Sequence, residues 1–443
     1  MLTMGLTADE KKQFEAALFI SHPIRITVTV LDQDEKPIGS LTGPQSLVIS
    51  GDIQMDASEK AGKDKLGTKR SLSLVILDSS HKLAIVPSTP ADQAVYLNNF
   101  ISVLYGVWVE TLYRWVDVPV FWGPVSVVTR SADDTVTIEA KGKESLVKEP
   151  NIMWNTMSFG KGKTVTSTIR EVLEAKGETR FGGLYENPNR KLVKTLSLSR
   201  TQDAWGPVQK LAETMNQQLF YDGEGNVRLR TIPTASCFTF DYSSGVNGGV
   251  TSRPEIVYDL ENTKNTVQVQ GNKNDQKTHV TATAYAPMGH PLSPSSLSRN
   301  GKPRYIVEQI NNDHIKRVEQ AQALADQRLD DNLLKNMDIT FDCLPIPHLE
   351  ENDLVTLKNS EYHINFRVTQ FTLPLTEQDS MSIGYTKPTK GSGGSGGGGG
   401  NGDPPESGGR PGGAGVKWKP LNKRQRAKMK RMRQRIKKPK AKK

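Results

Sequence analysis

Two short stretches of the chain carry residue types found in phosphate and metal sites. The first, Gly-Lys-Gly-Lys-Thr at 160–164, stands just before a predicted helix and resembles the end of a phosphate-binding loop. Such a loop needs a further glycine at position 157, where this chain has Met157. Without that glycine the backbone N–H groups cannot cradle a triphosphate. We therefore interpret residues 160–164 as a flexible basic turn.

The second stretch, residues 222–226, places the oxygen-bearing side chains Asp222, Glu224 and Asn226 at alternate positions, as calcium-binding loops do. Arg228 follows where another ligand is needed, and Pro233 occupies the twelfth position, where such loops carry a bidentate glutamate. The glycines between the polar residues favour the turn of a β-hairpin instead.

No other local pattern predicts catalysis. The seven histidines are scattered, without an HExxH or H-x-H pair, and neither Cys237 nor Cys343 has a neighbour at metal-ligand spacing. We expect both cysteines to be reduced thiols, and the acidic pairs at 330–331 and 350–351 to lie solvated on polar faces. The sequence thus predicts no catalytic residue, no cofactor and no metal site, and the chain is not expected to be an enzyme.

The end of the chain is the sharpest compositional feature. Residues 391–415 are rich in glycine, and residues 417–443 contain 15 Lys/Arg and no acidic residue. The whole chain has 58 basic and 48 acidic side chains, a net charge of +10, so removing the 15 positive charges leaves about −5 for residues 1–416. A mildly acidic body therefore carries a cationic tail.

The basic tail is the candidate partner-binding site. Leu421, Gln425, Met429, Met432 and Ile436 fall at helical spacing, with basic residues on the remaining faces. An acidic protein partner, nucleic acid, a membrane surface and a solubilising role are the alternatives, of which we favour the acidic protein. The residues expected to bind it are Lys423, Arg424, Arg426, Lys428, Lys430, Arg431, Arg433, Arg435, Lys437 and Lys438.

Periodicity and composition divide the chain into five segments. Residues 1–150 read as a short N-terminal helix, opened by a capping box at Thr7 and Glu10, followed by a first β unit. Residues 151–255 read as a small α+β module, and residues 256–388 as a second β unit with one long helix. Residues 389–416 form the linker and residues 417–443 the tail. The fold class is mainly β with an α+β insert.

The expected elements follow from alternating or helical spacing of apolar residues. The first unit contains strands at 24–30, 47–55, 71–77, 100–128 and 135–140, with Trp108, Trp115 and Trp122 expected in its core or at its edge. The module contains helices near 165–176 and 205–215 and a hairpin at 219–230. The second unit contains strands at 266–270, 278–285, 338–343, 354–358, 362–374 and 381–385 and a helix at 314–333.

Targeting signals are not expected. No stretch approaches the ~20 apolar residues of a membrane span. The N-terminus lacks the basic and then apolar pattern of a signal peptide. We expect a soluble chain made in the cytoplasm.

The order of these motifs resembles a known family. Val-Phe-Trp-Gly-Pro-Val at 120–125 and the strand at 135–146 resemble the end of the first barrel in phage baseplate hub proteins. Similar motifs follow at 203–212, 220–229, 265–271, 314–333 and 349–355. Together, over roughly residues 24–386, they are similar to the hub (tail-associated, minor tail) family of long-tailed bacteriophages.

The resemblance implies two tube-like β-barrel domains that flank the α+β module. It also implies a homotrimer whose six barrels present pseudo-sixfold symmetry to a hexameric tail tube. Many relatives continue into a lysozyme, a peptidase or a receptor-binding extension. This chain ends instead in a glycine-rich linker and a basic tail, which puts a lytic role in doubt.

The sequence therefore predicts a structural protein of the virion at the distal end of the tail. It would join the tail tube or distal tail ring to the tip and bound the DNA channel. Expected partners are the distal tail protein, the tape-measure protein and other tail-tip proteins, with transient contact to DNA and no stable membrane insertion. The alternatives are a nucleic-acid-binding protein acting through its basic tail and, less favoured, a cell-wall hydrolase.

Overall fold

The computed structural model describes most of the chain before the linker. The described residues are 5–20, 22–42, 47–57, 69–78, 95, 99–131, 133–148, 156–183, 190–199, 203–215, 217–231, 233–258, 263–273, 279–334, 337–360, 363–377 and 379–385. The segments 389–416 and 417–443, and with them every predicted partner-binding residue, lie outside this range. No helix among the described residues is long and apolar enough to cross a membrane.

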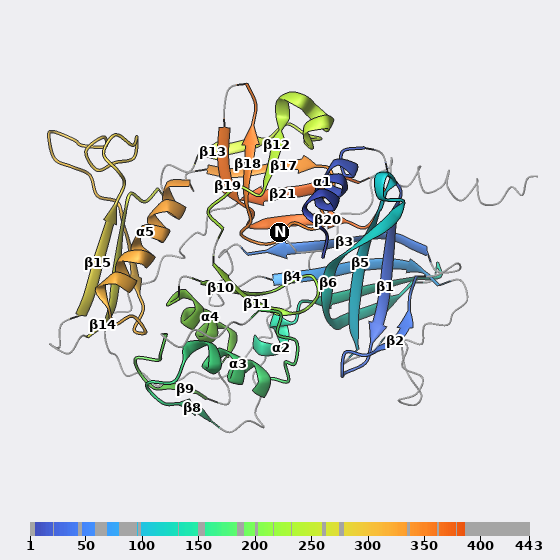
Figure 1. Cartoon of the computed structure of the whole chain (residues 1–443), viewed down its shortest axis with the longest axis horizontal. Coiled ribbons are helices and arrows are strands. Elements are labelled where there is room, and N and C mark those ends of the chain that lie inside the picture. Colours follow the sequence, from blue (N-terminus) through green and yellow to red (C-terminus); the bar gives the residue numbers. More distant parts are fainter. Residues whose placement is uncertain are drawn as a thin grey trace, which may run out of the picture. The chain divides into compact units, whose positions relative to one another are not determined.

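One large sheet of eleven strands dominates the protein (Figure 1). Its order is β13-β17-β21-β20-β3-β4-β7-β6-β5-β1-β2. Its strands are β1 (Ile24–Leu31), β2 (Pro37–Ser40), β3 (Leu47–Asp56), β4 (Lys69–Leu77), β5 (Phe100–Val109), β6 (Arg114–Arg130), β7 (Thr135–Lys141), β13 (Glu255–Tyr258), β17 (Met337–Cys343), β20 (Gln370–Pro374) and β21 (Met381–Tyr385).

The pairing of β3 with β20 joins the N-terminal and C-terminal β units. The two strands run antiparallel, and the register places Met55 opposite Phe371 and Ile53 opposite Leu373. All four side chains are buried in one apolar core that draws on both units. Apolar pairs across neighbouring strands stabilise a sheet, so this seam is held by side chains as well as by backbone hydrogen bonds.

The mainly β class is confirmed, but the described pairing closes neither of the two predicted barrels. The large sheet has β13 at one end and β2 at the other. Closing the first unit would require the outer edge of β3 to reach β2, and β20 already occupies that edge. Alternation within one strand predicts that the strand exists, but it does not predict which distant strand pairs with it.

Helix α1 (Ala8–Ala17) begins with the predicted capping box. The Glu10 N–H donates to Thr7 Oγ1 over 3.3 Å, and the Thr7 N–H donates to Glu10 Oε2 over 2.9 Å. Phe14 is fully buried on the large sheet's core, and its ring meets the edge of the buried His348 ring with centroids 5.3 Å apart. A short 3₁₀ helix, η2 (Glu110–Leu112), connects β5 and β6.

The α+β module has an apolar core of its own. It comprises α2 (Glu144–Lys148), β8 (Met157–Phe159), α3 (Val165–Ala175), β9 (Leu196–Leu198), α4 (Trp205–Glu213), β10 (Gln217–Tyr221) and β11 (Val227–Thr231). Trp205 is fully buried and stacks on Tyr221 with ring centroids 5.4 Å apart. Both predicted helices and the predicted hairpin are present.

Two smaller sheets complete the body. In the first, β12 (Phe238–Asp241) pairs in parallel with β18 (Leu354–Lys358), which pairs with β19 (His363–Arg367), and η3 (Tyr242–Gly248) follows β12. In the second, β14 (Thr266–Lys273) lies between β15 (His279–Tyr285) and β16 (Val307–Asn311), and α5 (Val318–Leu334) packs on β14 and β15.

Strands β12 and β13, within residues 238–258, pair with the C-terminal strands β18 and β17. The boundary predicted from the sequence, at residues 255 and 256, falls inside this segment. The two cysteines are not joined to each other. Cys343 is buried, Cys237 is half-buried, and burial raises the pKa of Cys237 to about 11.

Candidate functional site

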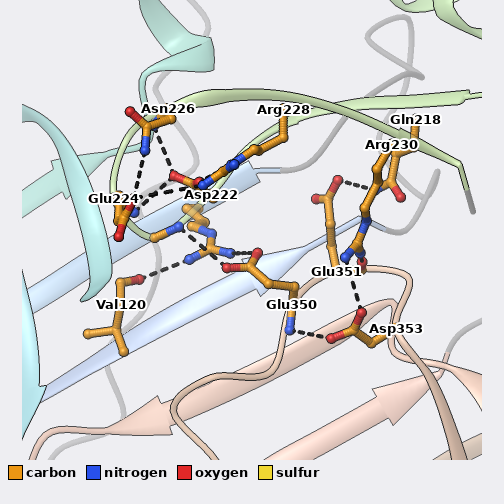
Figure 2. Close-up of polar contacts among 12 residues, drawn as sticks. Val120, Gln218, Asp222, Glu224, Asn226, Arg228, Arg230, Glu350, Glu351 and Asp353 are labelled. Atoms are coloured by element: carbon orange, nitrogen blue, oxygen red, sulfur yellow. Dashed lines mark hydrogen bonds and ion pairs between the residues drawn. The ribbon is translucent and has the colours of Figure 1, made fainter. Parts of the chain in front are cut away.

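A dense group of charged side chains lies where the β10–β11 hairpin meets the large sheet (Figure 2). The hairpin supplies part of the group, β4 supplies one arginine, and the loop between β17 and β18 supplies three carboxyl groups. We call this group the junction network, and it comprises Arg70, Gln218, Asp222, Arg228, Arg230, Glu350, Glu351 and Asp353.

The hairpin turn is built around Asp222. Asp222 Oδ1 accepts hydrogen bonds from the backbone N–H groups of Glu224 and Asn226, at 3.0 and 2.9 Å. Gly225 has φ +74°, and a Cβ there would lie 2.6 Å from the Trp122 side chain. Only glycine allows both this conformation and this close approach. The turn is therefore pressed against β6.

Arg228 supplies the counter-charge of the turn. Its Nε lies 2.6 Å from Asp222 Oδ2, and its Nη1 donates to the Gly182 carbonyl. Arg228 stands where a calcium-binding loop needs a ligand, and in the structure this arginine pairs with the carboxylate that a metal would need. The predicted hairpin turn is confirmed.

Arg70 and Glu350 connect the large sheet to the hairpin. Both are almost fully buried. Arg70 Nη1 donates to the Val120 carbonyl over 2.9 Å, and its Nη2 lies 2.5 Å from Glu350 Oε2. The Gly223 N–H reaches Glu350 Oε1 over 3.4 Å. Burial raises the pKa of Glu350 and the Arg70 guanidinium opposes this shift, so the carboxylate depends on its arginine partner.

Glu351 is a second buried carboxyl group in the junction network. It is 1% exposed, it accepts a hydrogen bond from Gln218 Nε2, and its carbonyl accepts one from Arg230. Arg230 Nη1 also lies 3.2 Å from Asp353 Oδ1. Burial raises the pKa of Glu351 to about 8, although Arg70 and Arg230 act in the opposite direction. The carboxyl group is therefore largely protonated at pH 7.

A second group, the Glu35 network, comprises Glu35, Trp122, Lys143, Glu178 and Arg180, and it meets the same hairpin where Arg180 donates to the Glu224 carbonyl over 3.1 Å. Lys143 is 2% exposed, and its Nζ lies 2.6 Å from Glu35 Oε1 and 2.8 Å from Glu178 Oε1. Trp122 Nε1 donates to Glu35 Oε2 over 2.8 Å, and the Arg180 guanidinium lies 4.0 Å from the Trp122 ring centroid. Trp122, expected in the core or at an edge, is half-buried where sheet and module meet.

The two networks constrain geometry. A buried ion pair adds little net stability because desolvation offsets the attraction, but removing one partner strands a charge and costs about 3–5 kcal/mol. The groups that form the networks lie far apart in the chain, so their pairing requires one particular orientation of module and sheet. Their charges face one another inside the protein. This arrangement suits a rigid joint better than a site that must receive a substrate.

Comparison with known proteins points to one kind of fold. No protein-family model matches the sequence, and no curated protein sequence is similar to it. Among solved structures, a 43 kDa tail protein of prophage MuSo2 from Shewanella oneidensis matches 83% of this chain and 99% of its own, at 13% identity and a TM-score of 0.50. A tail protein from Neisseria meningitidis MC58 matches 82% of this chain and 95% of its own, at 11% identity and the same TM-score.

The chain has the fold of phage tail proteins. The resemblance inferred from the order of motifs is thereby confirmed at the level of the fold. The match reaches across the body and extends over nearly the whole length of both solved chains. Within the tail-protein fold of this chain, the junction network and the Glu35 network fix the α+β module to the large sheet.

One interpretation of the sequence is wrong. Glu350 and Glu351, expected to be solvated, are only 3% and 1% exposed. Their partners lie at Arg70 and Gln218, far away in the sequence, so no local spacing could reveal the pairing. A usable signal is the context of the pair: two carboxyl residues and Asp353 follow Leu349, with no basic residue among them.

Proposed function

We propose that the chain is a structural hub at the distal end of a phage tail. Three copies form a ring that joins the tail tube or distal tail ring to the tip and bounds the DNA channel. The observation that carries the proposal is the match of fold over 83% of this chain and 99% of the Shewanella prophage tail protein. The proposal assigns the chain no catalytic residue.

The rigid joints of the protein support this role. A ring component that transmits load between tube and tip must keep its subunit shape. Here β3 and β20 unite the two β units, and buried ion pairs fix the module to the same sheet. Two β units per copy would give six around a threefold axis, which suits a sixfold tube.

The oligomeric state provides the first test. Light scattering on the purified full chain should give three times the mass of one chain, and cryo-electron microscopy of tail tips should place one threefold ring below the tube. A chain that stays monomeric at high concentration and in assembled tails contradicts the proposal. Threefold density elsewhere in the virion would retain the trimer and reject the location.

The basic tail is proposed to dock an anionic partner during assembly, such as the tape-measure protein or another tail-tip protein. Deleting residues 391–443 should leave the ring intact and reduce incorporation of that partner, as measured by mass spectrometry of purified particles. Unchanged particle composition and infectivity would reject the docking role. Filter binding with DNA across a salt series separates the alternative, because strong binding through ~15 basic groups falls steeply as salt rises.

A further inference from the structure

The connection between β15 and β16, residues 286–306, is unusually long. The structure describes all of it, and it contains neither a helix nor a strand. Connections of more than about 12–15 residues without such an element are uncommon in a compact domain and usually carry a function. Figure 1 shows this segment in yellow beyond the end of β15. We call it the tip loop.

A buried side chain anchors the base of the tip loop. Asn265, just before β14, is fully buried. Its Nδ2 donates to the Arg304 carbonyl over 2.8 Å, and its Oδ1 accepts from the Ile306 N–H over 2.7 Å. The Arg304 N–H in turn donates to the Pro294 carbonyl over 3.0 Å, which joins two parts of the loop. The backbone of the loop is thus fixed before a partner arrives, and a partner does not have to order it.

Two turns with glycine at positive φ hold side chains at the surface. In the first turn Gly289 has φ +90°, and Met288, directly before it, is 92% exposed. In the second turn Gly301 has φ +75°, and the backbones of Arg299 and Lys302 hydrogen-bond to each other on its two sides. Glycine adopts these conformations without strain. One turn therefore presents a thioether, and the other presents two cations.

The tip loop contains no negative charge to balance its cations. Residues 279–307 include no acidic residue. Arg299, Lys302 and Arg304 are exposed, and none of them forms an ion pair with a residue that the structure describes. Glu308, the first acidic residue after this segment, instead accepts a hydrogen bond from Asn332 of α5 over 2.7 Å. The three cations are therefore free to meet carboxylates of a partner.

Apolar side chains are exposed at the base of the same loop. The rings of Tyr285 and Tyr305 meet edge to face with centroids 5.8 Å apart, and each residue is 54% exposed. The register places Tyr285 and Val307 on either side of Thr266, and Val307 is 42% exposed whereas Thr266 is buried. We define the tip surface as the apolar residues Tyr285, Met288, Tyr305 and Val307 and the cations Arg299, Lys302 and Arg304.

We propose that the tip surface binds an acidic surface of another protein. Its cations call for carboxylates on the partner, and its tyrosines and Met288 call for apolar side chains among those carboxylates. Tyr, Met and Arg are residue types enriched in protein interfaces, and Tyr and Arg are prominent among the residues that dominate binding energy. Complementary charge also selects the partner, because like charges brought together are costly. The basic tail of this chain has the wrong sign to occupy the surface.

Other occupants fit the tip surface less well. A single-stranded nucleic acid needs aromatic faces on which successive bases stack and a track of cations along its backbone. Here the two tyrosine rings meet each other, and the aliphatic Met288 and Val307 give no such stacking face. A second copy of the chain that docked through the same surface would bring cations against cations. An acidic protein surface with apolar side chains satisfies both halves of the tip surface.

The inference goes beyond the proposed hub role and does not depend on it, because every residue of the tip surface belongs to one loop and its flanking strands. The test observes the full chain by NMR, with the methionine methyl groups labelled with carbon-13. Met288 reports on the tip surface, Met429 and Met432 report on the basic tail, and the buried Met55 and Met381 serve as references. The variant Met288→Leu assigns the Met288 signal.

The probe is a random copolymer of glutamate and tyrosine, which offers carboxylates and apolar rings together. Polyglutamate of the same length is the second probe, because it offers the charge alone. We expect both polymers to shift the tail signals, since the tail is cationic. We expect the copolymer to shift the Met288 signal at a concentration about tenfold lower than polyglutamate, because buried tyrosines contribute strongly to binding.

The charge of the tip surface is tested by reversing it. Arg299→Glu/Lys302→Glu should weaken the response of Met288 to the copolymer about tenfold or more, because repulsion replaces attraction. The matched control, Lys12→Glu/Lys36→Glu, makes the same change of net charge at two exposed lysines elsewhere and should leave the Met288 response unchanged. Unshifted signals from the buried methionines show that each variant is folded.

Three results would overturn the inference. The first is that the copolymer shifts only the tail signals and leaves Met288 unchanged at millimolar glutamate. The second is that the folded charge-reversal variant responds to the copolymer as the unaltered chain does. The third is that Met288 responds more tightly to a thymidine oligonucleotide, or shifts when the concentration of the chain alone is raised, which assigns the surface to nucleic acid or to a second copy.

Discussion

The α+β module and the three-stranded unit, formed by the sheet β15-β14-β16 and helix α5, are connected to the rest of the protein in opposite ways. The module meets the large sheet through buried ion pairs such as Arg70 with Glu350 and Lys143 with Glu35. The three-stranded unit meets the module through Lys194 and Asp313, whose side chains are 40% and 69% exposed and whose Nζ and Oδ2 atoms lie 2.8 Å apart. Buried charges demand one geometry, whereas an exposed pair tolerates several.

The largest expected effect comes from removing one partner of the buried junction. Arg70→Ala leaves the Glu350 carboxylate without its cation and the Val120 carbonyl without its donor. We expect a loss of about 3–5 kcal/mol in the free energy of unfolding, measured by urea denaturation. The control, Arg25→Ala, breaks the partly exposed pair with Asp117 and should cost about 1 kcal/mol or less. Equal losses would remove the distinction between the two kinds of contact.

A glycine pair tests how tightly the hairpin is pressed on β6. Gly225→Ala introduces a Cβ against Trp122 at φ +74°, whereas Gly289→Ala, in the loop after β15 at φ +90°, meets no atom within 4 Å. Both substitutions should lower the free energy of unfolding by roughly 1–3 kcal/mol, because a residue with a Cβ is strained in this backbone conformation. We expect a further loss of roughly 1–3 kcal/mol at Gly225 alone, from overpacking. Thermal melts compare the two, and equal shifts would mean that the turn is not tightly packed.

The protonated state of Glu351 predicts that the free energy of unfolding depends on pH. Its pKa rises from 4.5 to about 8 on folding because of burial. At a pH between these two values, the folded chain keeps a proton on this carboxyl group that the unfolded chain has released. Stability should therefore fall as pH rises from about 5 to 8, with a limiting slope of about 1.4 kcal/mol per pH unit for one proton. Glu351→Gln should flatten this slope. An identical pH profile for the variant would show that Glu351 is ionised in the folded state.

The smallest effect is expected at the exposed contact of the three-stranded unit. Lys194→Ala should change the free energy of unfolding by about 1 kcal/mol or less, and added salt should remove even this difference. Hydrogen exchange should show no loss of protection within β14, because its core is its own. A loss comparable to that of Arg70→Ala would place both regions in one rigid body.

Local patterns predicted most elements and little of their assembly. The capping box at Thr7 and Glu10, the strand from Ile24 and the hairpin turn at Asp222 all appear as expected, because each depends on residues close in sequence. Strands β2, β8, β9, β12, β13 and β16 were not predicted. Each has only three to five residues, so its alternating pattern is short.

The candidate site is harder to predict from the sequence than the fold is. In the sequence, Glu350 and Glu351 look like surface carboxylates, because their partners Arg70, Gln218 and Arg230 belong to distant segments of the chain. Burial is a property of the assembled chain, and a single sequence carries no direct record of it. The basic tail is the reverse case, a strong sequence signal at residues that the structure does not describe.

The seam between β3 and β20 has a consequence for biosynthesis. Residues 52–56 leave the ribosome early, but their partners at 370–374 appear only after some three hundred further residues, about 15–60 s later at ordinary elongation rates. During that delay the outer edge of β3 awaits its partner, and an exposed edge is a template for pairing between chains. Nascent chains on one polysome should therefore be prone to aggregation until the C-terminal strands emerge. A chaperone that shields this edge should raise the yield of native protein.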